Sequence, residues 1–211
     1  MSDPADQHPL WLGPTPLVLA SASATRFKLL TEAGLPVQVI LPNVDERAIE
    51  TPLKARGTAP ETIAVSLAIE KALSVSKRTM GRHVIGADQI LACDGVQLHK
   101  PLDRSSAAQQ LAFLSGRTHL LYSATCIALD HQIVASFVGT AKLTMRKLSA
   151  QMIERYLDAA GESVLASVGG YQLERTGMHL FSRIGGDHST ILGLPMLQLL
   201  DQLRKLGLVS E

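Results

Sequence analysis

Aromatic residues, excess charge of one sign and long apolar runs are all scarce in this chain of 211 residues. Phe, Trp and Tyr together make up 4% of the sequence, too few for the stacking surfaces that bind single-stranded nucleic acids. The formal net charge is only +1 at pH 7, so a strongly basic nucleic-acid face is missing as well. We therefore expect no nucleic-acid partner.

Membrane and secretory signals are also missing. The longest apolar region, residues 120–129, contains Tyr122 and Ser123 and is better explained as a strand than as a membrane span. The N-terminus has no basic segment followed by a long apolar one, so no secretory signal peptide is predicted. Cys93 and Cys126 fit two free thiols in a reducing compartment, with a disulfide between them as the alternative. Together these features predict a cytoplasmic protein with no membrane partner.

The chain is long enough for one sizeable domain. Residues 1–16 are rich in proline and are predicted to form a loose N-terminal arm. Residues 17–211 contain no linker, repeat or low-complexity tract, and are predicted to form a single α/β domain. Strand and helix patterns alternate, and a hairpin signal at Asp94-Gly95 is present, so the sheet is expected to be mixed.

Apolar spacing and turn residues predict most of the secondary structure. The predicted strands are residues 17–20, 37–41, 84–88, 90–93, 96–98, 118–129 and 132–145. The predicted helices are residues 23–34, 60–77, 104–114, 150–160 and 195–207. The segment after residue 41, which contains Asp45, Glu46 and Pro52, is predicted to be a polar loop.

The first predicted strand leads directly into a helix with polar side chains at its start. Ser23 is a good N-cap, and Arg26 shares the inward face of Leu29 and Leu30 because it lies three and four residues before them. A helix that begins where a buried strand ends directs free N–H groups at one point. With the hydroxyls of Ser21 and Ser23, this arrangement predicts a phosphate site; the alternative is an ordinary capped helix with a solvated arginine.

Asp88 ends the apolar run 84–88, where a carboxylate is costly unless it is paired, hydrogen-bonded or bound to a metal. Gly86 and Ala87 are small and are expected to leave room for a ligand. We therefore predict that Asp88 is a general base or a magnesium ligand, with a turn acid as the alternative. Glu46 would supply a second carboxylate, and two such groups can hold Mg²⁺ or Mn²⁺ against phosphate oxygens.

Two lysines stand at unusual positions. Lys71 continues an apolar stripe of the predicted helix 60–77, and Lys100 is fixed between the hairpin and Pro101. Both are predicted phosphate partners, with solvated surface positions as the alternative. With Arg26 they would supply the positive charge that a polyphosphate needs, while the carboxylates hold the metal ion.

Other kinds of site find no support in the sequence. The seven histidines include no close pair typical of zinc ligands. Neither a G-x-x-x-x-G-K-[ST] loop nor a G-x-G-x-x-G motif is present, so P-loop and dinucleotide-binding sites are excluded. Ser21 and Ser23 have no evident His and Asp partners for a serine-hydrolase triad.

From residue 17 to residue 207 the order and spacing of these motifs resemble the Maf family of nucleotide pyrophosphatases. The matching segments are Leu19-Ala20-Ser21-x-Ser23-x-x-Arg26-x-x-Leu29-Leu30, Asp45-Glu46, Leu67-Ala68-x-x-Lys71-Ala72, Gly86-Ala87-Asp88, Lys100-Pro101, Leu114-Ser115-Gly116-x-x-His119, Gly169-Gly170-Tyr171 and Gly193-Leu194-Pro195. The resemblance implies an α/β fold with an elongated, mixed and twisted sheet, flanking helices and two lobes around a cleft, similar to inosine-triphosphate pyrophosphatases.

The same resemblance implies an enzyme that hydrolyses nucleoside triphosphates to a monophosphate and pyrophosphate with a divalent metal ion, Mg²⁺ or Mn²⁺. It implies that Asp88 accepts the proton of the attacking water and that Lys71 and Lys100 assist catalysis. The implied substrate-binding residues are Ser21, Ser23, Arg26, Glu46 and Gln89. Glu46 and Asp88 are the implied metal ligands, and a homodimer is expected at the level of the family.

Three positions depart from the family pattern. Thr25 replaces the first of two frequent arginines, Gln89 replaces the usual threonine after the acid, and Glu174 replaces a glutamine. These changes bear on the choice between canonical pyrimidine triphosphates and modified substrates such as 7-methyl-GTP. The missing arginine and Glu174 also motivate a second hypothesis, a catalytically weak nucleotide-binding regulator of cell division. A phosphatase that releases orthophosphate is a third.

Overall fold

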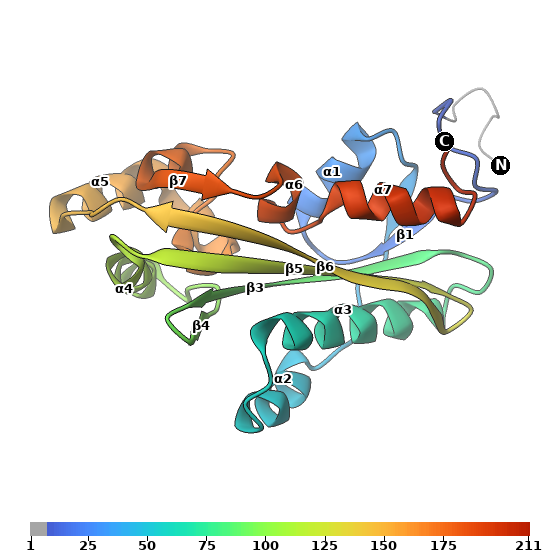
Figure 1. The fold of residues 1–211 in the computed structure, drawn as a ribbon, viewed down its shortest axis with the longest axis horizontal. Helices are drawn as coiled ribbons and strands as arrows, with labels where there is room; N and C mark the ends of the chain where they lie inside the picture. Colours follow the sequence, from blue (N-terminus) through green and yellow to red (C-terminus); the bar gives the residue numbers. More distant parts are fainter. Residues whose placement is uncertain (1–7) are drawn as a thin grey trace. The chain divides into compact units, whose positions relative to one another are not determined.

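The computed structural model describes residues 8–211. Within this part, seven strands form one mixed sheet in the order β2-β1-β3-β5-β6-β7, with β4 paired to β3 (Figure 1). β1 pairs in parallel with β2 and β3, whereas the β3–β4 and β6–β7 pairs are antiparallel. The expected mixed α/β class is confirmed. No helix among residues 8–211 has the length and hydropathy needed to cross a membrane.

The elements have the following bounds. The strands are β1 (Leu17–Ala20), β2 (Val37–Val39), β3 (Val84–Cys93), β4 (Val96–Leu98), β5 (Thr118–Leu129), β6 (Gln132–Met145) and β7 (Phe181–Gly185). The α-helices are α1 (Ala24–Glu32), α2 (Glu46–Ala55), α3 (Pro60–Ser76), α4 (Arg104–Leu114), α5 (Ala150–Ala160), α6 (His188–Ile191) and α7 (Met196–Lys205). Three 3-10 helices lie between α5 and β7: η2 (Gly161–Ala166), η3 (Val168–Gly170) and η4 (Thr176–Leu180).

The chain forms two compact units. Unit 1 comprises the residues up to Asp88 together with Ser123–Gly139 and Gly193–Glu211. Unit 2 comprises Gln89–Tyr122 and Thr140–Leu192. The long strands β3, β5 and β6 contribute residues to both units.

In unit 1, the two faces of β1 and β3 bury different helices, because side chains alternate along a strand. The face covered by α1 and α7 carries a cluster whose buried members include Leu17, Leu19, Leu30, Ile85, Ala87, Leu199 and Leu203. The opposite face packs on α3 through Val18, Ala20, Val75 and Val84. Figure 1 shows these helices on opposite sides of the strands. Asp88 continues the alternation of Val84 and Gly86, so the strand itself directs its carboxylate to the α3 face.

Unit 2 has its own apolar core, formed by α4, α5, the 3-10 helices and the parts of β3, β5 and β6 that belong to this unit. Its buried members include Leu91, Leu111, Leu114, Leu121, Leu143, Tyr156, Leu157, Tyr171 and Leu180. Helix α4 begins with a capping box, in which Asp103 accepts from the backbone N–H of Ser106 at 2.7 Å and the Ser106 hydroxyl accepts from the Asp103 N–H at 3.0 Å. This reciprocal pair fixes the start of α4 at the predicted residue.

Most predicted elements are confirmed to within a residue or two, including the two long strands and the helices at α1, α3, α4, α5 and α7. The hairpin after β3 is confirmed too, since Asp94 and Gly95 have φ angles of 49° and 77°, as a tight two-residue turn requires. The two strands predicted over 84–88 and 90–93 are one continuous strand, β3. The structure adds β7, α6 and the 3-10 helices, which the sequence analysis did not predict.

The predicted polar loop after residue 41 is wrong, because it contains helix α2. Asp45 caps this helix by accepting from the backbone N–H of Ala48 at 3.1 Å. Glu50 and Lys54, one turn apart, form an ion pair at 2.9 Å. Pro52 lies inside the helix without ending it, so the cap and the following turn outweigh one missing backbone donor.

The expected loose arm covers residues 1–16, of which residues 1–7 lie outside the described part of the chain. Residues 8–16 belong to unit 1 and are mostly exposed, with Trp11 and Gly13 buried. Trp11 is 4% exposed and forms an isolated β-bridge with Val209. The N–H of Leu12 also donates to the carbonyl of Leu208 at 2.9 Å. Burial of the large indole ring anchors this part of the segment at Trp11.

Candidate active site

Lys71 joins two carboxylates in unit 1. Its Nζ atom lies 2.6 Å from Oδ1 of Asp88 and 2.9 Å from Oε1 of Glu46. Lys71 and Asp88 are each 7% exposed, whereas the side chain of Glu46, at the start of α2, is about half exposed. The Lys71–Asp88 contact is therefore a buried ion pair in which each charge offsets the desolvation of the other.

Gly86 allows α3 to lie close enough to β3 for this contact. A Cβ atom at position 86 would lie 2.2 Å from the carbonyl oxygen of Ala68 and 2.5 Å from the backbone nitrogen of Ala72, both in α3. No side chain fits there without moving the helix. The expectation that Gly86 leaves room for a ligand is wrong, since backbone atoms of α3 occupy that space.

The Arg26 guanidinium is anchored by three acceptors of unit 1. Its Nη1 atom donates to Oγ of Ser21 at 3.1 Å and to the carbonyl of Ala87 at 2.9 Å. Its Nε atom donates to the carbonyl of Gly193 at 2.9 Å. Arg26 therefore ties α1 to the residue before Asp88.

Burial lowers the pKa of Arg26, while the negative charges of Asp88 and Glu46 oppose that shift. Arg26 thus lies within the electrostatic field of both carboxylates. The sequence analysis did not predict the carbonyls of Ala87 and Gly193 as its partners. The carbonyl of Gly193 belongs to the Gly193-Leu194-Pro195 motif, which resembles the family pattern. The motif does not indicate which group this carbonyl binds, because any residue can supply a backbone acceptor.

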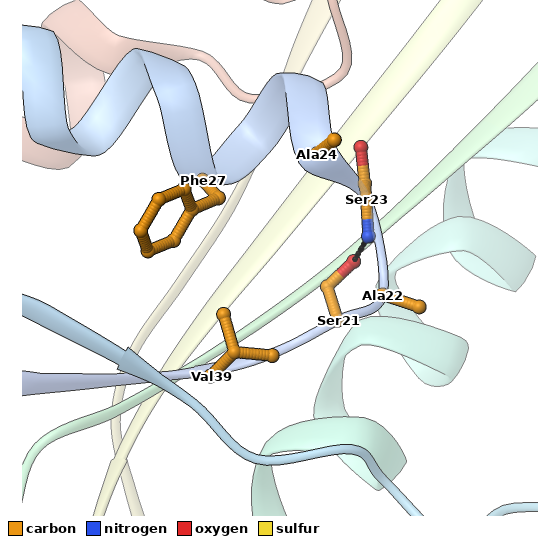
Figure 2. Close-up of a pocket in the computed structure, with 6 residues that line it drawn as sticks. All are labelled: Ser21, Ala22, Ser23, Ala24, Phe27 and Val39. Atoms are coloured by element: carbon orange, nitrogen blue, oxygen red, sulfur yellow. Dashed lines mark hydrogen bonds between the residues drawn. The ribbon is translucent and has the colours of Figure 1, made fainter.

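The turn between β1 and α1 is held by its own serines. The N–H of Ser23 donates to Oγ of Ser21 at 3.2 Å, and Oγ of Ser23 accepts from the backbone N–H of Arg26 at 3.3 Å. The second bond is the predicted N-cap of α1. Figure 2 shows the turn beside a pocket lined by Ser21, Ala22, Ser23, Ala24, Phe27 and Val39.

The chemistry of Asp88 and Glu46 fits a divalent metal ion such as Mg²⁺ or Mn²⁺. One oxygen of each carboxylate contacts Nζ of Lys71, so both carboxylates lie within ion-pair distance of the same ammonium group. Mg²⁺ is often held by one or two protein carboxylates together with substrate phosphates and water. Among residues 8–211 no cluster of three or more His, Cys, Asp or Glu side chains is arranged to hold a metal ion.

Two of the predicted site residues, Gln89 and Lys100, belong to unit 2. The Gln89 side-chain Nε2 donates to the carbonyls of Thr190 at 3.2 Å and Ile191 at 3.0 Å. Lys100 follows β4 and is exposed. The six residues that share unit 1 are Ser21, Ser23, Arg26, Glu46, Lys71 and Asp88. The roles of Gln89 and Lys100 in catalysis and substrate binding stay predictions.

The fold and the site define a class: mixed α/β proteins with a charged site beside the end of β1, where this strand pairs in parallel with β3. The family model for Maf-like proteins matches residues 16–206, and the chain belongs to this family. The resemblance stated from the motifs is confirmed.

Three curated relatives match almost their whole length. A nucleoside triphosphate pyrophosphatase of Nitrobacter winogradskyi is 52% identical over 202 residues, covering 95% of this chain and 98% of that protein. A nucleoside triphosphate pyrophosphatase of Bradyrhizobium diazoefficiens is 48% identical over 201 residues, with the same two coverages. A 7-methyl-GTP pyrophosphatase of Rhizobium meliloti is 47% identical over 194 residues, covering 92% of this chain and 98% of that protein.

Proposed function

We propose that this chain is an enzyme that hydrolyses nucleoside triphosphates to a nucleoside monophosphate and pyrophosphate. The observation that carries the proposal is the contact of Lys71 with both Asp88 and Glu46, in a site that also includes the half-buried Arg26. Such a site offers cations to phosphate oxygens and a carboxylate to water. The names of the relatives support the same reaction.

In the proposed reaction Asp88 accepts a proton from the water that attacks the α-phosphorus. The water oxygen forms a bond to this phosphorus, and the bond from the α-phosphorus to the bridging oxygen of the β-phosphate breaks. Pyrophosphate leaves with the electron pair of that bond. Lys71 holds the Asp88 carboxylate in position, since the two groups lie 2.6 Å apart in a buried pair.

Arg26 and Lys71 would offset the negative charge that develops on the phosphate oxygens. A divalent metal ion held by Asp88 and Glu46 would neutralise further phosphate charge and polarise the phosphoryl group. We propose Lys100 as an additional cation and Gln89 as a substrate contact on the family resemblance alone. Ser21 and Ser23 would contact the substrate at the start of α1.

We extend the proposal to three properties that are typical of the family. Residues 17–211 would act as one catalytic domain, the protein would form a homodimer, and it would reside in the cytoplasm. Light scattering during gel filtration measures the mass of the protein in solution. A mass of about two chains supports the dimer, and a mass of one chain rejects it.

The experiment that tests the proposed function is product analysis by ion-exchange chromatography. The purified chain is incubated with Mg²⁺ or Mn²⁺ and a panel of canonical nucleoside triphosphates and 7-methyl-GTP, the last because one relative carries that name. A monophosphate and pyrophosphate in equal amounts would support the proposal, and the ranking of rates would give the base preference. Orthophosphate as the product would instead indicate a phosphatase, and intact nucleotides would favour a binding regulator.

A further inference from the structure

We propose that the pocket in Figure 2 binds the nucleobase of the substrate, with the ring of Phe27 as its stacking surface. This inference rests on the proposed function and deepens it. The pocket lies in unit 1, between the first turn of α1 and β2. Its lining combines the side chains of Phe27, Val39 and two alanines with two serines.

Phe27 is exposed in a way that no other aromatic residue of this chain is. The sequence has four Phe, three Tyr and one Trp, and all of them lie within residues 8–211. Trp11, Tyr156 and Tyr171 are buried, and Phe113, Tyr122, Phe137 and Phe181 are half-buried. Phe27 is 39% exposed, and its pocket neighbour Val39 is 41% exposed. The exposed part of the phenyl ring forgoes a hydrophobic gain, which a flat apolar ligand would restore.

The pocket is joined to the ion cluster of Lys71, Asp88 and Glu46 through two side chains, those of Ser21 and Arg26. Ser21 lines the pocket and is 6% exposed, and its Oγ atom accepts from Nη1 of Arg26. The same Nη1 donates to the carbonyl of Ala87, the residue before Asp88. An apolar wall and a charged site therefore meet at Ser21. A nucleotide has the same division, with a flat base at one end and charged phosphates at the other.

The chemistry of the lining indicates a stacking site rather than one that reads a base by its edges. Its side chains carry hydroxyls at Ser21 and Ser23 but no carboxylate, amide or cation. Stacking of a base on an aromatic ring contributes about 1–3 kcal/mol and tolerates every base, because each base has a π-face. We therefore infer that Phe27 adds affinity for nucleotides in general.

The test compares substrates with and without a base. The kcat/KM values of wild type, Phe27→Ala and Phe27→Tyr are measured for a nucleoside triphosphate and for methyl triphosphate, which carries no base. Phe27→Ala should lower kcat/KM for the nucleotide by about 5- to 150-fold, the equivalent of one lost stack, and leave methyl triphosphate unchanged. Phe27→Tyr keeps an aromatic face and should stay within about twofold of wild type.

Leu197→Ala serves as the matched control, since Leu197 is also an exposed apolar residue of unit 1, at 69%, and does not line the pocket. It should leave both substrates unaffected. An unchanged nucleotide kcat/KM in Phe27→Ala overturns the proposal, and so does an equal loss for both substrates. A change from dimer to monomer without any base-dependent loss also overturns it, because Phe27 would then cover a second copy of the chain.

Titration calorimetry with nucleoside monophosphates separates this proposal from the proposed function. If wild type hydrolyses nothing but binds UMP or 7-methyl-GMP, and Phe27→Ala weakens that binding, the pocket stands and the proposed reaction fails. If wild type hydrolyses nucleotides and Phe27→Ala binds the monophosphates as tightly as wild type does, the reaction stands and the pocket proposal fails.

Discussion

Unit 1 and unit 2 bury polar side chains in opposite ways. In unit 1, Lys71 and Asp88 form a buried pair of opposite charges. In unit 2, Nε2 of His119 and the Tyr171 hydroxyl form a hydrogen bond at 2.7 Å, and Phe181 packs edge-on against Tyr171. Burial lowers the pKa of His119 to about 4 and raises that of Tyr171, so both groups are neutral at pH 7.

Between these two clusters, only the one in unit 1 carries the desolvation cost of buried charges. An apolar pair would be as stable as a buried ion pair or more stable, so stability alone does not explain Lys71 and Asp88. The neutral pair of His119 and Tyr171 fits a packing role, although among residues 8–211 the buried Nδ1 atom of His119 has no hydrogen-bond partner. The comparison therefore supports the proposed role of Lys71, Asp88 and Glu46 in unit 1, and a packing role for His119, Tyr171 and Phe181 in unit 2.

The largest effect should come from removing the charge of Asp88. Asp88→Asn should lower kcat by about 10²- to 10⁴-fold, the usual contribution of a positioned general base. Asp201→Asn is the matched control, because Asp201 of α7 is also paired with a lysine, Lys205, at 2.8 Å but is exposed. It should keep wild-type turnover. Steady-state kinetics on both variants, with circular dichroism to verify folding, checks the difference; equal turnover in the two variants would remove Asp88 from the mechanism.

The close packing of α3 on β3 gives the second prediction. Gly86→Ala would force a Cβ against backbone atoms of α3, and we expect a loss of about 3 kcal/mol in the free energy of unfolding, together with lower activity. Gly185→Ala in β7 is the control, because the nearest atom to its added Cβ is 3.6 Å away, an ordinary contact. Urea titrations of both variants measure the two free energies. A Gly86→Ala protein as stable as Gly185→Ala would contradict the packing described here.

Acid should destabilise the chain through His119, which is 1% exposed. Its pKa is about 4 in the folded state and near 6.5 when unfolded, so the unfolded state binds more protons between these values. Stability should therefore be complete above pH 6.5 and fall as the pH drops toward 4, by roughly 3 kcal/mol from this group. His119→Gln, which keeps a polar partner for Tyr171, should flatten this part of the pH profile.

The control for that profile is His179→Gln, since His179 is exposed in η4. Urea unfolding at pH 7, 6, 5 and 4 gives the slope for each protein. The slope is the change in the free energy of unfolding with pH. If His119→Gln leaves this slope as steep as in wild type, or if His179→Gln flattens it equally, the neutral burial of His119 does not cause the pH dependence.

The smallest effect should follow the loss of one helix cap in unit 2. Ser149 accepts from the backbone N–H of Met152 at 3.1 Å at the start of α5. Ser149→Ala should lower the free energy of unfolding by about 1 kcal/mol and leave kcat unchanged at 25 °C. Ser105→Ala, an exposed serine of α4, should change stability less. A fall in kcat for Ser149→Ala would contradict the expectation that the cap of α5 contributes to stability and not to turnover.

The sequence predicted the elements whose signals are local. The cap at Ser23, the Asp94-Gly95 turn and the two long strands β5 and β6 depend on a few neighbouring residues, and each was confirmed. Helix α2 was not predicted, because Pro52 falls inside it and its polar first residues are also typical of a loop. Short elements such as β7 carry too few residues for a periodic pattern.

The sequence predicted the residues of the candidate site but not most of their contacts. Lys71 was singled out because it continues an apolar stripe of a helix, and Asp88 because it follows an apolar run of a strand. In the structure the two side chains are in contact. The packing of α3 over Gly86 and the carbonyl partners of Arg26 depend on backbone atoms far apart in the sequence, for which residue type gives no signal. Phe27 was absent from the predicted site because the exposure of a side chain is decided by tertiary packing.

We propose that water activated at Asp88 attacks the α-phosphorus of the substrate. The most direct test is turnover of a nucleoside triphosphate in H₂¹⁸O, with mass spectrometry of both products. We predict one ¹⁸O atom in the nucleoside monophosphate and none in pyrophosphate. Label in pyrophosphate or in orthophosphate would place the attack on another phosphorus and contradict the claim.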